Sequence, residues 1–138
     1  MSKLESPMTR RYWERIGGTL IEEFPLVLDR PGVRRRQADA VIIVDGEHRI
    51  ASWRENLSLE GHDVIVVQSK ARQLGMNLFG QALGSRELIL RRFTPKSVRT
   101  IALCATDDAA LRPIAESYGV EVVVDAGDET QASEELEP

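Results

Sequence analysis

In the second half of the chain, two apolar runs flank one segment whose apolar positions have helical spacing. Residues 63–69 and 98–105 are rich in β-branched and other apolar side chains, which is typical of strands buried on both faces. Between them, apolar side chains recur every three or four residues from Met76 to Arg92, which predicts an amphipathic helix. We expect Gly80 and Gly84 on this helix to let it lie close to the sheet.

A shorter helix and a last strand should follow. Asp107 is the residue type that caps helices, so we expect a helix over 108–118, ended by Gly119. Residues 120–124 are almost entirely valine and predict a final strand.

The first third predicts one helix and then a meander of strands. The apolar positions from Trp13 to Phe24 are spaced by three or four residues, which predicts a helix over 9–24 that ends before Pro25. Strands are expected over 26–28 and 37–44 and, after a hairpin turn at Asp45-Gly46, over 47–53.

Together these elements predict an α/β fold with a mixed central β-sheet flanked by helices. The order is α-β-β-(β)-β-α-β-α-β, in which the α/β alternation implies parallel strands and the hairpin meander implies antiparallel ones. We expect a single domain over residues 1–124 and an acidic, disordered tail over 125–138.

Composition agrees with one soluble globular domain. The chain has 138 residues, 42% of them apolar and 29% charged, and no apolar run approaches the length of a membrane span. The start of the chain does not resemble a signal peptide, so the cytoplasm is the expected compartment. One cysteine, Cys104, and two histidines are too few for a usual structural zinc site.

The net charge of −4 hides an uneven distribution. The tail carries six acidic residues and no basic one, so residues 1–124 have a net charge of +2. Basic residues gather at Arg34-Arg35-Arg36 and between Lys70 and Arg99. Such runs are often only a solvated surface, but here they favour a polyanionic partner.

Candidate chemistry lies around the strand over 63–69. Gln68 and Lys70 fall on one face of this strand, because side chains alternate between faces. Asp39, an unusual residue for a strand, lies in the preceding predicted strand. A carboxylate and an amide oxygen can bind Mg²⁺, and the lysine can act on water or on phosphate. The alternative is that the strand reaches the surface there and Lys70 is merely solvated.

Other residues could complete such a site. Glu22 and Glu23 fall in the last turn of the predicted helix, where negative charge is unfavourable, and either could supply a second carboxylate. They could equally be solvated glutamates. Gln81, on the helix after Lys70, could face the same site or the solvent.

These residues and this element order resemble the PD-(D/E)XK, or restriction endonuclease-like, nuclease superfamily. The resemblance covers about residues 9–105 and implies an α-β-β-β-α-β core with a C-terminal αβ extension. It implies that Asp39, Gln68 and Glu22 or Glu23 hold Mg²⁺ or Mn²⁺, with Lys70 as the catalytic lysine and DNA as substrate. Gln68 stands where Glu or Asp is usual, and in this respect the chain is similar to Mrr-like nucleases.

Three hypotheses remain open at this stage. The chain is a metal-dependent deoxyribonuclease, a catalytically inactive relative that binds DNA or protein, or an α/β protein unrelated to nucleases. Because so small a domain cannot easily surround a duplex, a homodimer is expected if it acts on double-stranded DNA.

Overall fold

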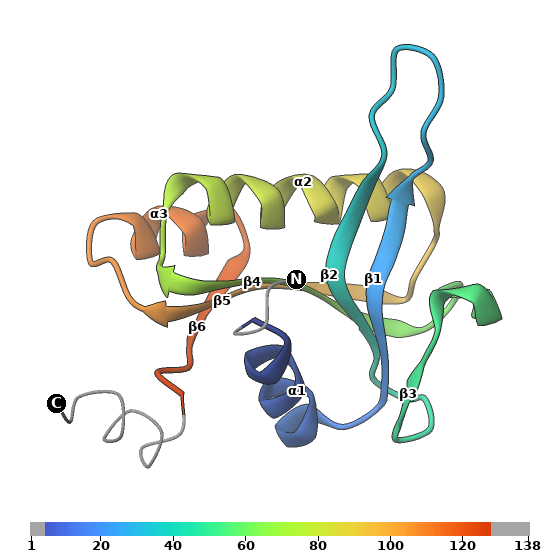
Figure 1. Cartoon of the computed structure of the whole chain (residues 1–138), viewed down its shortest axis with the longest axis horizontal. Coiled ribbons are helices and arrows are strands. Elements are labelled where there is room, and N and C mark those ends of the chain that lie inside the picture. Colours follow the sequence, from blue (N-terminus) through green and yellow to red (C-terminus); the bar gives the residue numbers. More distant parts are fainter. Residues whose placement is uncertain (1–4, 128–138) are drawn as a thin grey trace, which may run out of the picture.

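Six strands form one mixed sheet in the order β3-β1-β2-β4-β5-β6. The computed structural model describes residues 5–127 (Figure 1). Its elements are α1 (Glu5–Ile16), β1 (Thr19–Val27), β2 (Arg36–Ile43), β3 (Arg49–Ala51), a 3₁₀ turn (Trp53–Glu55), β4 (Asp63–Gln73), α2 (Met76–Arg92), β5 (Ser97–Thr106), α3 (Leu111–Ser117) and β6 (Val120–Val124).

Strand directions confirm the mixed α/β fold. Strands β1, β2 and β4 are antiparallel neighbours, as a meander requires. Strands β4, β5 and β6 run parallel and are joined through α2 and α3.

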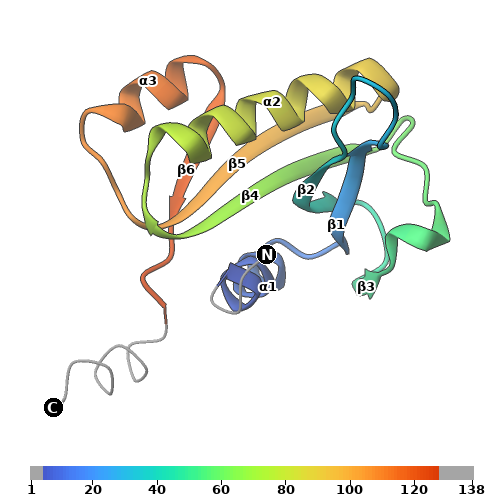
Figure 2. The same ribbon diagram turned by 45° about the horizontal axis from the view of Figure 1, so that its top comes forward.

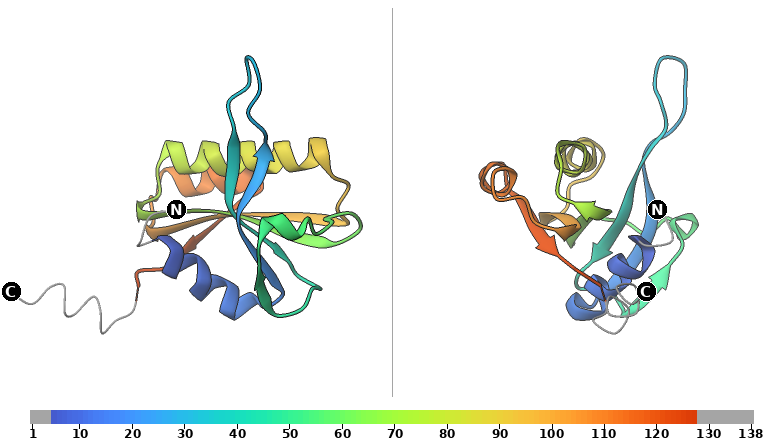
Figure 3. Two further views of the ribbon diagram at one scale, coloured as in Figure 1. Left: turned by 45° about the vertical axis from the view of Figure 1, so that its right-hand side comes forward. Right: turned by 60° about the vertical axis from the view of Figure 1, so that its left-hand side comes forward.

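Helices cover both faces of the sheet, as Figures 2 and 3 show. Helix α1 lies on one face, and α2 and α3 lie on the other. Along β4, Ile65 and Val67 pack in the cluster that contains Trp13 of α1, whereas Val64 and Val66 pack in the cluster that contains Ile89 of α2. The run of β-branched residues is therefore buried on both sides, as predicted.

Helix α2 begins and ends where the sequence predicts, and its buried residues are Leu78, Ala82, Ser85 and Ile89. The prediction for its glycines was wrong. A Cβ atom added at Gly80 or at Gly84 would meet no other atom within 4 Å, so neither glycine brings the helix closer to the sheet.

The helix predicted over 9–24 is wrong in its second half. Helix α1 ends at Ile16, and residues 19–27 form β1. Gly17 and Gly18 both have positive φ, which interrupts a helix. Pro25 is tolerated in β1 because β3 accompanies this strand only from Thr19 to Ile21, leaving a free edge beyond.

The hairpin predicted at Asp45-Gly46 is also wrong. A turn does form there, with the Gly46 amide 3.1 Å from the Ile43 carbonyl oxygen. The chain then crosses to the outer side of β1, where the short β3 pairs in parallel. Both edges of β2 are already occupied, by β1 and β4, so a return strand has no place beside it.

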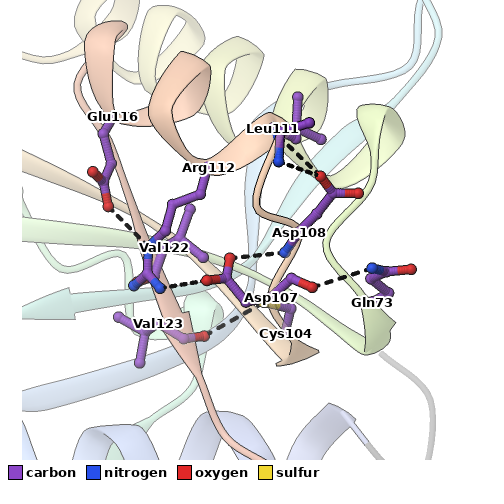
Figure 4. A network of polar contacts seen from close by, with 10 residues as sticks. Gln73, Cys104, Asp107, Asp108, Leu111, Arg112, Glu116, Val122 and Val123 are labelled. Carbon is purple, nitrogen blue, oxygen red and sulfur yellow. Dashed lines mark hydrogen bonds and ion pairs between the residues drawn. The ribbon is translucent and has the colours of Figure 1, made fainter.

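The C-terminal extension is held by a polar network around the start of α3 (Figure 4). Asp107 was expected to cap this helix, but Asp108 accepts hydrogen bonds from the amides of Ala110 and Leu111 instead. Asp107 forms an ion pair of 2.7 Å with Arg112. The last strand, β6, forms where it was predicted.

The expected acidic tail begins at the edge of the described residues. Asp125 accepts two hydrogen bonds from the Arg11 guanidinium of α1, at 3.0 and 3.2 Å. Residues 128–138, where the other five acidic side chains of the tail lie, are outside the described part.

The connection between β1 and β2 stands out from the body on the side of α2 (Figures 1 and 3). We call residues 28–35 the arm. At its base, Arg92 of α2 donates hydrogen bonds to the carbonyl oxygens of Pro25 and Leu26, at 2.9 and 3.1 Å.

Within residues 5–127, no helix has the length and apolar character needed to cross a membrane.

Candidate functional site

Strands β2 and β4 separate at the point where two predicted site residues lie. The backbone ladder between them ends at the pair Ala40–Val67. Beyond it, the Asp39 carboxylate accepts a hydrogen bond from the Ser69 amide at 2.8 Å, and the Gln68 side-chain oxygen accepts one from the Asp39 amide at 3.3 Å. Two side chains thus replace the next rung of the ladder. We call this arrangement the fork.

The orientation of the Gln68 side chain is determined by its partners. A backbone amide can only donate, so the atom facing the Asp39 amide must be Oε1. Nε2 then donates to Ser85 Oγ on α2, at 2.6 Å. Gln68 is only 5% exposed, so its amide is held in a buried and fully directed position.

The surroundings of Asp39 disfavour the charged form of its carboxyl group. Burial raises the pKa of Asp39, and the negative charges of Glu5 and Glu23 act in the same direction. The hydrogen bond from the Ser69 amide opposes them. A cation near Asp39 would relieve both the burial cost and the repulsion.

Helix α1 approaches the fork from the other face of the sheet. Thr9 Oγ1 lies 2.7 Å from Ser69 Oγ in the buried interface. Glu5 accepts a hydrogen bond from the Ala71 amide at 3.2 Å. The prediction missed Glu5 because the helix begins at this residue and not at 9. An acidic residue before a proline, in the position of a helix first turn, was the available signal.

The two predicted glutamates lie on β1 and not on a helix. Glu22 faces α1, where its carboxylate is 2.8 Å from Arg10. Glu23 has a φ of 51° and interrupts the regular pairing of β1 with β2. Of the two, Glu23 is the one whose charge acts on Asp39.

Lys70 lies two residues beyond Gln68 on β4 and is exposed. Ser69 contacts α1 and Ala71 packs in the α1-side cluster, so alternation directs Lys70 toward the α2 side, with Gln68. It has no hydrogen bond or ion pair to the residues that the structure describes.

A groove of about 770 Å³ opens beside the fork, between the start of β2 and α2. Asp39, Gln68 and Gln81 all line it, so these three predicted residues come together; Glu22, Glu23 and Lys70 are not among its lining residues. Arg35 and Arg36 line the β2 side.

The atoms at the fork that could bind a metal ion are the side-chain oxygens of Asp39 and Gln68. Oxygen ligands suit a hard cation such as Mg²⁺. The part of the chain described here holds no group of three or more His, Cys, Asp or Glu side chains able to bind a metal. Asp39 and Gln68 would therefore supply few ligands, and waters and phosphate the remainder. Such partial ligation is common for Mg²⁺ in proteins.

Comparisons of the chain with protein-family models, with curated proteins and with solved structures found no match.

Proposed function

We propose that this chain is a metal-dependent nuclease domain that hydrolyses phosphodiester bonds in DNA. The observation that carries the proposal is the fork, where a half-buried carboxylate and a directed amide oxygen meet beside a groove with two arginines. Support also comes from the sheet, in which β1, β2 and β4 are antiparallel neighbours and β4 and β5 are parallel.

Every predicted site residue except Glu22, which forms an ion pair with Arg10, has a role in this proposal. Asp39 and Gln68 would hold Mg²⁺ or Mn²⁺, and Glu23 adds negative charge nearby. The cation would neutralise charge on the phosphate and lower the pKa of the attacking water. Lys70, extending from the same face as Gln68, orients that water or stabilises charge on the phosphate. Gln81 would contact the DNA strand from α2.

One observation favours a second candidate, a catalytically inactive domain that binds DNA. Both polar atoms of the Gln68 amide are already hydrogen-bonded within the protein. The neutral amide also supplies one negative charge fewer than the Glu or Asp usual at this position. In this alternative the fork only joins β2 to β4, and Arg35 and Arg36 in the groove contact the DNA.

The test is cleavage of plasmid, single-stranded and branched DNA with Mg²⁺ or Mn²⁺, compared between the parent chain and Lys70→Ala. Lys70 is exposed and forms no hydrogen bond or ion pair with a residue that the structure describes, so the Lys70→Ala variant should fold normally. We expect it to lose about 10²-fold or more in cleavage rate, the scale on which single groups stabilise transition-state charge.

Arg54→Ala is the matched control, since it removes one exposed positive charge from the 3₁₀ turn, away from the groove. It should cleave as the parent does. If the parent cuts none of these substrates with either metal, the enzyme proposal fails. Metal-independent binding that weakens with salt would then favour the binding domain.

A further inference from the structure

Four neighbouring arginines, three in the arm and Arg36 at the start of β2, form no ion pair with any acidic side chain that the structure describes. Six arginines form ion pairs with acidic side chains: Arg10, Arg11, Arg49, Arg86, Arg99 and Arg112. Arg30, Arg34, Arg35 and Arg36 are all exposed, and none forms an ion pair with any described residue. With Asp29 as the one acidic residue among 28–36, this segment carries a net charge of +3.

Part of this charge lies along one wall of the groove. Arg35 and Arg36 line the groove directly, and the arm continues outward from them on the side of α2 (Figure 3). Arg92 fixes the base of the arm through two carbonyl oxygens. A positively charged wall on a fixed base attracts a polyanion toward Asp39.

The opposite wall, formed by α2, includes two glycines. Gly80 and Gly84, one turn apart on α2, both line the groove, and a Cβ added at either meets nothing within 4 Å. Glycine inside a helix costs about 1 kcal/mol against alanine, and here no packing contact offsets that cost. The backbone of α2 is thus open to close approach at these two positions, and the side chains of Asn77, Gln81 and Glu87 also line this wall.

We propose that the groove receives a single sugar–phosphate strand of DNA, held backbone-first between the arm and the glycine face of α2. This inference rests on the proposed function and adds to it the way the substrate is bound. A volume of about 770 Å³ is in the range of pockets for small ligands, so it takes a short stretch of one strand and not a duplex.

Recognition at this groove is independent of base sequence. None of its lining residues is aromatic, so it provides no ring for stacking bases. Its two lining arginines pair with phosphates, which are the same for every sequence. The arm therefore sets affinity and position and leaves sequence unread.

The first experiment measures binding without cleavage. Anisotropy of a fluorescein-labelled single strand and of its duplex is followed in EDTA and in Ca²⁺, over a range of salt concentrations. For Arg35→Ala/Arg36→Ala we expect about tenfold weaker binding at low salt and a salt slope smaller by about two. Arg15→Ala/Arg54→Ala, which removes two exposed charges away from the groove, should leave both quantities unchanged.

The second variant, Gly84→Leu, fills the groove while improving the helix. Leucine has a much higher helix propensity than glycine, and the position is open, so the melting temperature should not fall. DNA binding should nevertheless weaken by about tenfold or more, because the side chain occupies the path of the strand. A structural role for Gly84 would lower stability and binding together.

The outcomes separate this inference from the proposed function. Binding that depends on the arm and on Gly84, without any cleavage, supports the groove and overturns the enzyme. Cleavage that persists in both groove variants at parental rate and affinity overturns the groove and leaves the enzyme. Undetectable binding by the parent chain, or equal losses in the control variant, also overturns the groove.

Discussion

At the scale of single residues, Asp39 and Gln68 serve both the fold and the proposed site. Their hydrogen bonds to backbone amides join β2 to β4 where the ladder stops. The same two oxygens are the proposed cation ligands. Substitutions that preserve the hydrogen bonds but change the charge can separate these two roles.

Gln68→Glu should make stability more dependent on Mg²⁺. The new carboxylate can still accept from the Asp39 amide, but it faces Asp39 as a like charge that a divalent cation would neutralise. We expect a larger rise of melting temperature with Mg²⁺ than in the parent chain. Gln81→Glu, in the same groove, is the control; an equal rise in both variants would argue against a cation at the fork.

Asp39→Asn should be more stable than the parent at neutral pH. Because the folded-state pKa of Asp39 is raised, the parent loses stability as pH rises from the ordinary value of 3.8 through the folded-state pKa. Asparagine does not ionise and keeps an oxygen for the Ser69 amide. Urea unfolding across pH should show a gain at neutral pH that vanishes below 3.8. Cleavage should be lost in this variant, whereas a loss of stability at every pH would refute the assigned shift.

At the scale of elements, the turn from α1 to β1 depends on Gly18 more than on Gly17. Both have positive φ, at 79° and 86°. A Cβ at Gly18 would collide with the carbonyl oxygen of Ile43, whereas one at Gly17 would meet nothing within 4 Å. Gly17→Ala should therefore cost about 1–2 kcal/mol from backbone strain alone.

Gly18→Ala should cost more, roughly 2–4 kcal/mol, because overlap with a backbone atom is added to the strain. Denaturant unfolding of the two variants gives the comparison directly. Equal costs would mean that the contact with β2 is easily relaxed.

The turn at Gly17-Gly18 also illustrates which elements could be predicted from the sequence. Strand β5 and helix α2 were predicted well because each is a long, uniform pattern, whereas β4 continues to Gln73, four residues beyond its predicted end. Trp13 to Phe24 keeps a helical spacing across Gly17 and Gly18, so spacing alone could not separate α1 from β1. The parallel pairing of β3 depends on which sheet edge is free, and no local pattern encodes that.

The candidate site was likewise only partly predictable from local sequence patterns. The pairing of Asp39 with Gln68 did not follow from the local patterns, because the expected hairpin placed a strand over 47–53 beside 37–44, whereas β2 pairs directly with β4. Glu5 contacts Ala71 and Thr9 contacts Ser69, so these contacts join residues that are 66 and 60 positions apart in the sequence. Such contacts follow from the packing of α1 on the sheet, which requires the three-dimensional structure.

At the scale of the whole molecule, the acidic end of the sequence opposes a polyanionic ligand. A chain that ends at Gly127 loses five acidic residues, and its net charge rises from −4 to +1. We expect it to bind DNA several-fold more tightly at low salt, with the difference disappearing as salt screens the charges. Replacing the same residues by Asn and Gln in the full chain should have the same effect. Unchanged affinity would show that this charge does not reach the DNA-binding surface.

The proposal that the groove takes one strand also predicts how a duplex would be cut. One domain would nick a single strand, and cutting both strands together would require two domains related by a two-fold axis. We therefore expect plasmid linearisation only at concentrations where sedimentation detects a dimer, and nicking below them. Linearisation in one step by a monomer would contradict single-strand binding.

The fork also provides a direct spectroscopic reporter of ligand binding. The amide protons of Asp39 and Ser69 are bonded to the two side-chain oxygens proposed to hold a cation. A cation that draws those oxygens away would leave both amides without their acceptors, changing their chemical shifts and speeding their exchange with deuterium. The amides of Ala40 and Val67, one rung back in the ladder, should stay protected. Two neighbouring pairs of resonances would thus distinguish an occupied site from a purely structural junction.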